Sequence, residues 1–527
     1  MKLRLVLLAL LTLVAGWERC QNISFGLPDH FRPDEEYLVS RAVGFQEDFN
    51  PHFAVYPALQ MYVQHAALRA GSWWRGETGD FRIYLRENNY APAHLSGRAV
   101  SVGFGTLTVP ALYWAAMPAF GPVAALTSAA ALTFATIHVR ESKYATTDAA
   151  GTFWLTLAMG AMLRILRDGR IRWSILGGVL TGLAIATKYP TGAILAGLAV
   201  AHIGARWREG RTLWRVVRDL RPWLTLYFAV FTAVLATPWI FLDWQQTMKD
   251  FTYQRGFVER GVGNPFGGWG WDWFLGKVMP DSFGPELAIA LGLALVWVVL
   301  RPRLGTLSLL TFVVIALIGI TSSRYAFYRY VMVPLPALLL FLGIAVADLR
   351  TLAARFVPGR LATAGTALLV ALLLVPCVIR DYKLNRLLGR RDSRTMARQW
   401  IEENVPRGAR IATTLPRTPY GKPQLGGRNV WVALDDAAAL RERGVHWVLS
   451  DSDMLPFYSP GFSTEELRAL ARDAELRFEV NPLKPDTPAP IFDQGDAFYV
   501  PLRHASSVKR PGPRIRIWKL ADVAGGR

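Results

Sequence analysis

The sequence predicts a polytopic α-helical membrane protein that carries a C-terminal soluble α/β domain. Hydrophobic residues make up 52% of the 527 residues, and the mean hydropathy is +0.22. A bilayer, rather than one large core, must therefore accommodate the apolar surface. A series of apolar runs long enough, or nearly long enough, to cross a bilayer supports this class. The composition changes abruptly after residue 380, which predicts the soluble domain.

The apolar runs predict about eleven transmembrane helices. The first run follows Lys2 and Arg4 and can be interpreted as a cleavable signal peptide or as a retained span, although Ala15-Gly16-Trp17 lacks the small-residue cleavage pattern. Either interpretation places the next segment, about 18–97, outside as a first outer loop with juxtamembrane helices. The runs lie at roughly 3–17, 98–118, 122–138, 146–166, 173–187, 190–204, 223–242, 286–300, 305–321, 330–348 and 361–379.

The formal net charge of +19 is explained by topology. In a soluble protein this charge would suggest nucleic acid, but in a polytopic protein the positions of Lys and Arg in the loops set the orientation. With a cytoplasmic N-terminus, the predicted inner loops around 164–172, 206–221, 301–303 and 350–360 all contain arginines. The positive-inside rule is therefore met, and no nucleic-acid partner is expected.

Several kinds of site are excluded by features that the sequence lacks. Cys20 and Cys377 are far apart, so neither a disulfide framework nor a cysteine-based metal site is supported. The sequence contains no Walker-type loop, no G-x-G-x-x-G after a strand and no H-E-x-x-H. An ATP-driven pump is therefore not expected, and the lack of internal repeats argues against an inverted-repeat transporter.

The segment that follows the last apolar run predicts a small α/β domain outside the membrane. Short β-prone runs alternate there with amphipathic helical patterns. We therefore divide the chain into a transmembrane domain, 1–380, and an extracytoplasmic domain, 381–527. The β-prone runs are Arg410–Thr413, Val430–Leu434 and Val445–Leu449, and the helical patterns are Thr395–Asn404, Asp435–Arg443 and Ser463–Leu476.

An acidic cluster, Arg32-Pro33-Asp34-Glu35-Glu36-Tyr37, lies at the head of the first outer loop. One interpretation is a helix start, since Pro suits the first turn and acids there complement the helix dipole. The other is a catalytic site, because a carboxylate at the membrane boundary can accept a proton from an acceptor hydroxyl. Asp34 is then the first candidate for the base, with Glu35 and Glu36 beside it, and the choice within the triplet stays open.

A second polar group follows the third span. Arg140, Glu141, Lys143 and Asp148 lie within nine residues, and interfacial anchoring with mutual salt bridges is the plain interpretation. Asp148 lies at the start of the fourth span and is followed directly by apolar residues, and an acid that enters the bilayer is a functional-site candidate. His138 lies three residues before Glu141 and makes these two weak metal-ligand candidates.

Basic residues at two further outer turns suit an anionic lipid. Lys188 interrupts two apolar half-segments, and Arg324 and Arg329 flank a short aromatic stretch that includes Tyr325. Guanidinium and ammonium groups bind phosphate well. The alternative is that these long side chains snorkel to phospholipid headgroups.

A tryptophan-rich outer loop lies at about 244–285. Its Gly-rich stretch contains Trp269 and Trp271. Tryptophans at this height usually form the interfacial belt. The alternative is that they cover the face of a sugar.

Taken together, these short motifs resemble the bacterial membrane glycosyltransferases that use polyprenyl-phosphate sugars. This superfamily includes the protein O-mannosyltransferases and the lipid A aminoarabinose transferase, which have the type C glycosyltransferase fold. The similarity covers about residues 1–380 in order, and the start of the outer domain, from Asp392-Ser393-Arg394 onward, is similar to soluble tails on such enzymes. The motifs are Pro33-Asp34-Glu35, the stretch from Asn50-Pro51-His52-Phe53 to Tyr56-Pro57, the turn from His138 to Asp148, Ala186-Thr187-Lys188-Tyr189, and the stretch from Arg324 to Pro336.

The resemblance implies an inverting transfer of a sugar from a polyprenyl-phosphate carrier to a hydroxyl of a protein, lipid or polysaccharide acceptor, at the outer face of the bacterial inner membrane. Membrane lipids are the other expected partners. The essential acid of the first outer loop maps to Asp34, although Glu36 makes this motif more acidic than the family pattern. No cofactor is implied with certainty, because family members differ in their need for a divalent metal. The further residues implied are Asp148 or Glu141 as a second acid, Lys188, Arg324, Arg329 and Arg140 for the carrier phosphate, and Trp269, Trp271 and Tyr325 for sugar or acceptor.

Two other classes of protein remain as alternatives. The first is a lipid-linked-sugar flippase or another secondary transporter, which should carry ionisable residues near mid-bilayer. In this sequence such residues gather instead at the predicted outer boundary. The second alternative is a membrane-anchored sensor, which would account for residues 381–527 but leaves most of the spans without a role.

Overall fold

The structure is a computed structural model of the chain. It describes residues 2–76, 85–210, 214, 217–260, 270–322, 327–414, 420–452, 455, 463–493 and 500–521. The chain forms two compact units. The helical unit comprises Met1–Ile23, Tyr37–Tyr84 and Pro92–Asp381, and the sheet unit comprises Ser24–Glu36, Leu85–Ala91 and Tyr382–Arg527.

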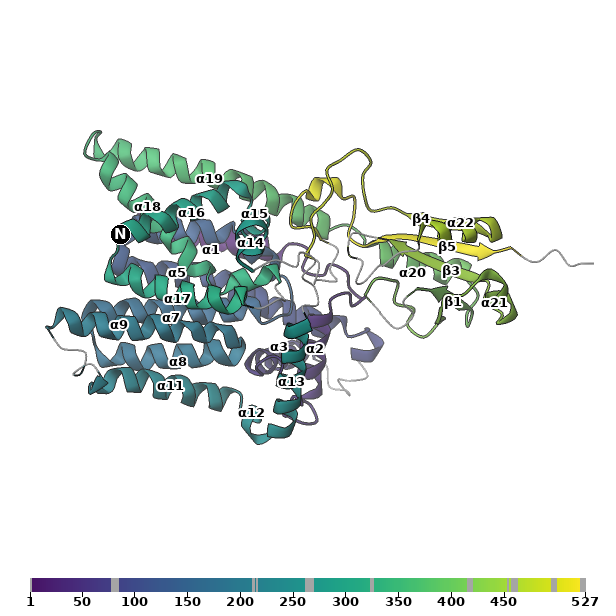
Figure 1. Cartoon of the computed structure of the whole chain (residues 1–527), viewed down its shortest axis with the longest axis horizontal. Helices are drawn as coiled ribbons and strands as arrows, with labels where there is room; N and C mark the ends of the chain where they lie inside the picture. The colour runs from purple at the N-terminus through teal and green to yellow at the C-terminus, as the bar shows by residue number, and fades with distance from the viewer. Residues whose placement is uncertain are drawn as a thin grey trace, which may run out of the picture. The chain divides into compact units, whose positions relative to one another are not determined.

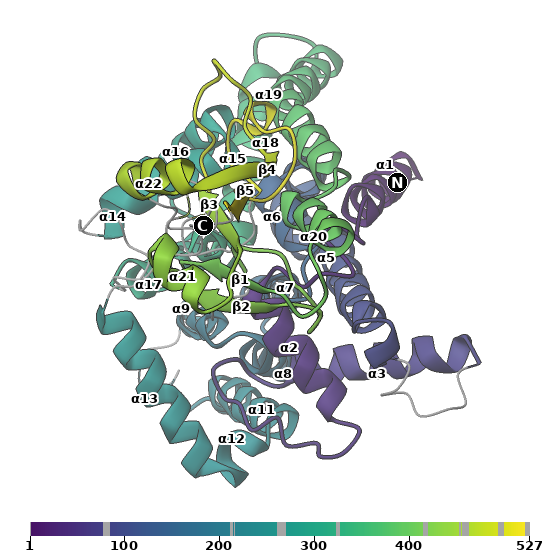
Figure 2. The ribbon, with the colours of Figure 1, turned by 90° about the vertical axis from the view of Figure 1, so that its right-hand side faces the viewer.

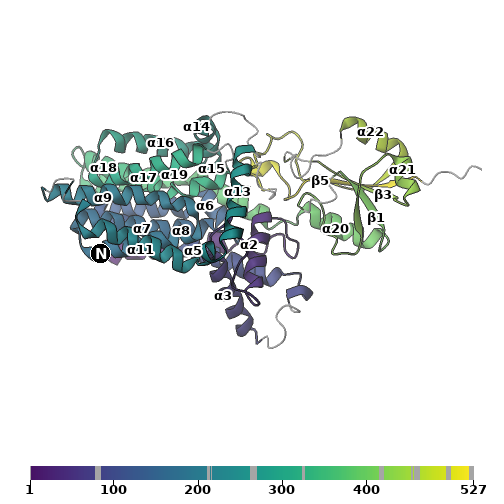
Figure 3. The same cartoon turned by 60° about the horizontal axis from the view of Figure 1, so that its bottom comes forward.

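The helical unit consists of long apolar helices that pack side by side. Figures 1 and 3 show α7, α8, α9 and α11 as one such group, and α7 contacts both α8 and α9. The long helices are α1 (Lys2–Cys20), α5 (Ala91–Thr133), α7 (Asp148–Asp168), α8 (Ile171–Thr187), α9 (Ile194–Arg208), α11 (Leu220–Ala236), α16 (Pro285–Leu300), α17 (Leu304–Thr321), α18 (Leu335–Ala353) and α19 (Gly359–Leu388).

Among the described residues, 5 helices are long and apolar enough to cross a membrane, and three shorter apolar helices accompany them. This confirms a helical membrane protein, whereas the number of about eleven spans stays a prediction. Each predicted apolar run lies mainly in a helix. The second and third runs share α5, which is interrupted at Gly121, where φ is 79°.

Short helices fill the connections between the long ones. Among the described residues, the predicted outer loop at 244–285 is largely helical, and the first outer loop contains the helices α2 and α3. A small apolar cluster of Leu38, Phe45 and Met61 packs these two helices together. The short elements are α2 (Pro33–Gly44), α3 (Leu59–Trp74), α6 (Thr136–Glu141), η1 (Tyr189–Ala193), α12 (Trp239–Leu242), α13 (Trp244–Arg260), α14 (Gly270–Trp273), η2 (Phe274–Val278), α15 (Met279–Phe283) and η3 (Tyr328–Met332).

The sheet unit is built on one five-stranded sheet with the strand order β2-β1-β3-β5-β4. The first strand pairs in parallel with β2 and β3, and β5 runs antiparallel to β3 and β4. The sheet is therefore mixed, as in many α/β domains with an antiparallel edge. The strands are β1 (Arg410–Thr413), β2 (Val430–Ala433), β3 (Trp447–Ser452), β4 (Ala474–Val480) and β5 (Arg514–Leu520).

Alternate residues of the strands build an apolar core on each face of the sheet. On one face, Ile411, Leu449 and Ile517 pack with Ala397 and Ile401 of α20 (Ser393–Asn404). On the other face, the core is completed by helices α21 (Ala437–Glu442) and α22 (Thr464–Asp473). Figure 2 shows α20 on one side of the strands and α21 and α22 on the other.

The predicted small C-terminal domain with a sheet is confirmed, although several element boundaries differ and strands β4 and β5 were not predicted. The helical pattern predicted for Ser463–Leu476 ends at Asp473, because Ala474–Leu476 pair with β5 as the start of β4. Pairing with a distant strand outweighs the local helical pattern there. The alternation of β5, Arg-Ile-Arg-Ile-Trp-Lys-Leu, was a detectable strand signal.

Close packing of α8 on α11 depends on two glycines of α8. A Cβ atom on Gly178 would lie 2.4 Å from the carbonyl oxygen of Thr225, and one on Gly182 would lie 2.6 Å from that of Ala229. Such distances are shorter than van der Waals contact, so only glycine lets the two backbones approach this closely.

Gly182→Ala should lower the free energy of unfolding by about 1–3 kcal/mol, because α8 and α11 must separate to accept the new methyl group. The measurement is the melting temperature of the detergent-purified protein. Gly319→Ala in α17 is the matched control, since its Cβ would meet nothing within 4 Å. Equal melting temperatures for the two variants would contradict the close-packing argument.

Candidate functional site

The short connection between α7 and α8 makes these helices an antiparallel pair, so the start of α7 and the end of α8 lie at the same end of the helical unit. Asp148 is the first residue of α7, and Lys188 follows the last residue of α8. The two residues are 3% and 7% exposed. The Lys188 ammonium donates a hydrogen bond to Asp148 Oδ1 in a buried ion pair. The sequence suggested both residues but not that they pair.

The short helix η3 supplies the next groups of the site. It contacts both α6 and α7. Thr152 Oγ1 donates to the carbonyl oxygens of Asp148 at 2.8 Å and of Met332 at 3.3 Å, which ties η3 to the first turn of α7. The Tyr330 ring lies 5.7 Å from Lys188 Nζ. The guanidinium of Arg329, which is buried, lies 3.8 Å from the Phe327 ring.

A second buried ion pair lies on α6. Arg140 Nη1 and Glu141 Oε1 are 3.2 Å apart, and both side chains are buried. The mutual salt bridge predicted for this turn is thus present between Arg140 and Glu141. Asp148, in contrast, pairs with Lys188 from another turn. Each candidate second acid therefore pairs with a candidate phosphate ligand, Asp148 with Lys188 and Glu141 with Arg140, and the choice between the two acids stays a prediction.

Lys143, another charged residue of this turn, holds the C-terminal end of helix α1 through hydrogen bonds. Lys143 Nζ donates to the carbonyl oxygens of Arg19 at 3.2 Å and of Gln21 at 2.9 Å, at the C-terminal end of α1. Burial, and then the nearby Arg19 charge, lowers the pKa of Lys143 to about 7. Arg19 in turn donates to the carbonyl oxygen of Leu132 at 3.1 Å. Lys143 is therefore a structural anchor of α1.

The donor set predicted for a metal does not fit one. His138 Nδ1 lies 2.8 Å from Arg19 Nη2, and Glu141 is paired with Arg140, so each candidate ligand faces a cation that would repel a metal ion. Across the residues that the structure describes, no group of three or more His, Cys, Asp and Glu side chains is placed to hold a metal ion.

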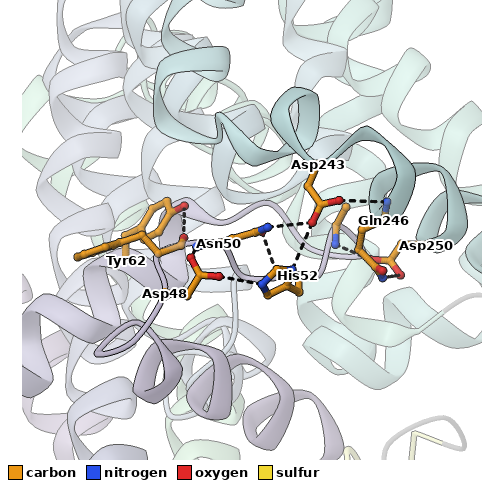
Figure 4. Close-up of polar contacts among 9 residues, drawn as sticks. Asp48, Asn50, His52, Tyr62, Asp243, Gln246 and Asp250 are labelled. Carbon is orange, nitrogen blue, oxygen red and sulfur yellow. Dashed lines mark hydrogen bonds and ion pairs between the residues drawn. The ribbon is translucent and has the colours of Figure 1, made fainter.

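The first outer loop forms a polar network with the segment between α12 and α13, which the sequence reasoning missed (Figure 4). His52 lies between Asp48 Oδ2, 2.9 Å from its Nε2, and Asp243 Oδ2, 3.3 Å from its Nδ1. Asn50 Nδ2 also donates to Asp243 Oδ2 at 2.8 Å. The hydrogen bond from the Asn50 backbone amide lowers the pKa of Asp48, and that from the Asn50 side chain lowers the pKa of Asp243.

The same loop is tied to the neighbourhood of Lys188. The Ala54 backbone amide donates to Asp250 Oδ2 at 2.6 Å, and the Tyr189 hydroxyl donates to the Ala54 carbonyl oxygen at 2.9 Å. Tyr189 is the residue after Lys188. One sequence signal pointed to this network: Asp243 directly follows an apolar run, as Asp148 directly precedes one. A pocket beside the network is lined by Asn50, Phe53, Tyr56, Trp239, Asp243 and Gln246.

The acidic triplet lies at a helix start. Helix α2 begins at Pro33 and has Asp34, Glu35 and Glu36 in its first turn, so the helix-start interpretation is confirmed. Glu35 is 2% exposed, and Asp34 and Glu36 are half-buried. This first turn belongs to the sheet unit, whereas the rest of α2 belongs to the helical unit. A base role for Asp34 stays a prediction.

The remaining predicted residues are one exposed tryptophan and three positions that the structure does not describe. Trp271 is in α14 and is 41% exposed. Arg324, Tyr325 and Trp269 lie outside the described residues. Asp281 was not predicted, but it accepts a hydrogen bond of 3.0 Å from the Tyr328 hydroxyl.

Comparisons with known proteins found a matching family model and several solved structures of similar fold. A family model described as dolichyl-phosphate-mannose-protein mannosyltransferase matches residues 63–252. A search of curated proteins found no match. Among solved structures, ArnT from Cupriavidus metallidurans bound to undecaprenyl phosphate is similar with 16% identity and a TM-score of 0.50, over 99% of this chain and 99% of that one.

A second similar structure is the oligosaccharyltransferase of Archaeoglobus fulgidus tethered to an acceptor peptide. It shares 12% identity at a TM-score of 0.52, over 91% of this chain and 73% of that one. At these identities the likeness shows the fold. The type C glycosyltransferase fold that the motifs predict is therefore confirmed, and the family model agrees with the resemblance to protein O-mannosyltransferases.

Asp148→Ala should destabilise the protein by about 3–5 kcal/mol, because it leaves the buried Lys188 ammonium without its counterion. The double variant Asp148→Leu with Lys188→Met should regain most of this loss. Thermal unfolding in detergent measures both. Asp435→Ala, which breaks the 3.2 Å ion pair with Arg443, is the exposed control and should cost about 0–1 kcal/mol. A single Asp148 variant as stable as wild type would show that the pair is not formed.

The contacts of Asp48 and Asp243 should weaken in acid. Because the folded state holds both pKa values below the ordinary 3.8, these carboxylates stabilise the fold fully above that pH and lose their contribution as the pH falls through the lowered values. Hydrogen exchange of residues 48–54, corrected for intrinsic rates, should rise below about pH 4. Asp48→Asn is expected to reduce this rise, and exchange that does not change with pH would contradict the network.

Proposed function

We propose that this chain is a glycosyltransferase that moves a sugar, with inversion, from a polyprenyl-phosphate carrier to an acceptor hydroxyl at the outer face of the membrane. The observation that carries the proposal is the buried Lys188–Asp148 pair at the end of α8, within the segment that matches the mannosyltransferase model. The fold likeness to a protein bound to undecaprenyl phosphate, over nearly the whole chain, supports the choice of carrier.

The chemistry needs cations more than a general acid. When the bond between the sugar and the carrier phosphate breaks, the phosphate leaves with an additional negative charge, and preorganised cations stabilise it. Lys188 supplies a compact ammonium, and Arg329 supplies a guanidinium on the neighbouring η3. Asp148 is assigned the role of holding Lys188 in place, since the pair fixes the ammonium before the carrier arrives.

The acceptor side needs one base. As the acceptor oxygen bonds to the anomeric carbon, its proton must leave, and Asp34 is the proposed acceptor of that proton. A single displacement of this kind inverts the anomeric centre, because the acceptor attacks opposite the leaving phosphate. No nucleotide site is required, since the sugar arrives already activated on its carrier.

The proposed location is a bacterial inner membrane. Apolar helices make the chain a membrane protein, and the arginine-rich predicted inner loops favour a cytoplasmic N-terminus. The acceptor side and the sheet unit would then be periplasmic in a bacterial inner membrane. A protein, a lipid and a polysaccharide remain possible acceptors, and the aromatic residues Trp269, Trp271 and Tyr325 are the proposed contacts for sugar or acceptor.

Transfer from defined polyprenyl-phosphate sugars to peptide, lipid and oligosaccharide acceptors, in nanodiscs, tests the function. Asp34→Asn is expected to lower kcat by about 100-fold or more, as for loss of a general base. Lys188→Met should raise KM for the donor and also lower kcat. Asp435→Asn, an exposed acid of the sheet unit, is the matched control and should behave as wild type.

Two outcomes would overturn parts of the proposal. If Asp34→Asn transferred sugar at the wild-type rate, Asp34 would not be the general base. Absence of transfer by wild type, together with translocation of the lipid-linked sugar across liposomes, would favour the flippase alternative.

A further inference from the structure

The sheet unit is not confined to the C-terminal part of the chain. Its compact fold takes in Ser24–Glu36 of the first outer loop and the short segment Leu85–Ala91. The first of these segments ends with the first turn of α2 and therefore carries Asp34. Three sets of contacts join it to residues that follow Asp392, more than 350 positions later.

The first contact pairs a side-chain amide with the backbone of the loop. The His30 backbone amide donates to Gln424 Oε1 at 2.9 Å, and Gln424 Nε2 donates back to the His30 carbonyl oxygen. This two-way bonding satisfies both backbone groups of His30, as a neighbouring strand would. The loop is thereby held at a single residue, four positions before Asp34.

The second contact is an ion pair at Asp29, which is buried. Asp29 Oδ1 lies 3.2 Å from Arg398 Nε, and Asp29 Oδ2 accepts a hydrogen bond of 2.7 Å from Thr395 Oγ1. Both partners are on α20, so one face of that helix anchors the loop.

The third contact reaches the acidic turn itself. The Tyr420 hydroxyl donates to Glu36 Oε2 at 2.8 Å. The carbonyl oxygen of Tyr420 accepts a hydrogen bond from Arg394. Arg394 is fully buried and also lies 3.7 Å from the Phe31 ring. Asp392 holds Arg394 through two bonds, of 2.9 Å to Nε and 2.7 Å to Nη2.

These contacts are made by residues that lie before and after Asp34 in the sequence. Phe31 is held three residues before it, and Glu36 is held two residues after it. A helix turns by about 100° per residue, so fixing the Glu36 carboxylate fixes the rotation of the first turn and the direction in which Asp34 points. A base must be placed to within about 0.5 Å of its working geometry, and the contacts with the sheet unit help to supply that accuracy.

We propose that the sheet unit positions Asp34 for catalysis, and that Tyr420, through Glu36, and Gln424, through His30, are the positioning residues. This inference rests on the proposed function, in which Asp34 is the base. The C-terminal domain then has a role in the rate of the chemical step, in addition to any part in acceptor choice.

The test compares kcat and KM for donor and acceptor in the full-length protein in nanodiscs. Tyr420→Phe removes one hydroxyl and should lower kcat by about tenfold, with KM for the donor unchanged. Gln424→Ala should lower kcat in the same way. Tyr382→Phe is the matched control, because it removes the same hydroxyl from a tyrosine that is 62% exposed in the same unit, and its kcat should equal that of wild type.

Glu36→Gln separates positioning from general loss of structure. The amide keeps an oxygen that accepts the Tyr420 hydrogen bond, so this variant should retain most of kcat, whereas Glu36→Ala should lose about as much as Tyr420→Phe. Tyr420→Phe combined with Glu36→Ala should be no worse than either change alone, since both remove the same bond. If the two changes lowered kcat additively, the inference that Tyr420 acts through its hydrogen bond to Glu36 would be wrong.

The two proposals fail in different ways. If wild type transfers sugar and Asp34→Asn does not, but Tyr420→Phe and Gln424→Ala keep wild-type kcat, the positioning inference is wrong and the proposed function stands. A rise in KM for the acceptor alone, with kcat unchanged, would show that these residues select the acceptor and would overturn the inference. Failure of wild type to transfer sugar would remove the premise of both.

Discussion

The buried ion pair between Lys188 and Asp148 is the constraint on which the candidate site depends. A buried ammonium is tolerated only with a counterion, and Asp148 supplies it from the first residue of α7. The pairing requires α7 and α8 to pack antiparallel with their ends level, and the tight approach of α11 to α8 at Gly178 and Gly182 supports that pair from the other side. The position of the Lys188–Asp148 pair thus depends on how α7 packs against α8.

Some other buried charged side chains of the helical unit also have a nearby partner of opposite charge or a hydrogen-bond acceptor. Arg140 pairs with Glu141 on α6, and Lys143 satisfies backbone carbonyl oxygens at the C-terminal end of α1 that the helix itself leaves without partners. Of the basic groups in this region, Lys143 is therefore committed to structure. Lys188 differs because, among the described residues, its hydrogen-bond acceptor is the Asp148 carboxylate, and an ammonium has three protons to donate, so it can also bind an incoming phosphate.

Local patterns in the sequence predicted the helices and strands that depend mainly on residues close to one another along the chain. The apolar runs, the helix that starts at Pro33 and the strands β1, β2 and β3 are of this kind. The partners of the charged groups could not be predicted in this way, because Lys188 and Asp148 are 40 residues apart, and Asn50 and Asp243 are 193 apart. Either acid of the turn, Glu141 or Asp148, stays a candidate, and the structure adds the basic partner of each, Arg140 and Lys188. Strand β4 was missed for the same reason, since its pairing with β5 is a long-range property.

The first outer loop shows why such long-range partners matter for function. Ordering each loop residue costs about 1–2 kcal/mol of backbone entropy, which the apolar cluster around Phe45 and polar contacts with distant residues both offset. Its two polar parts are therefore ordered by partners elsewhere in the chain: residues 29–36 by Arg398, Gln424 and Tyr420, and residues 48–54 by Asp243 and Asp250. Because the acid-bearing turn and the histidine-bearing stretch have separate anchors, a change in one anchor can alter one part while leaving the other in place. The loop is thus better described as two separately held segments than as a single flexible lid.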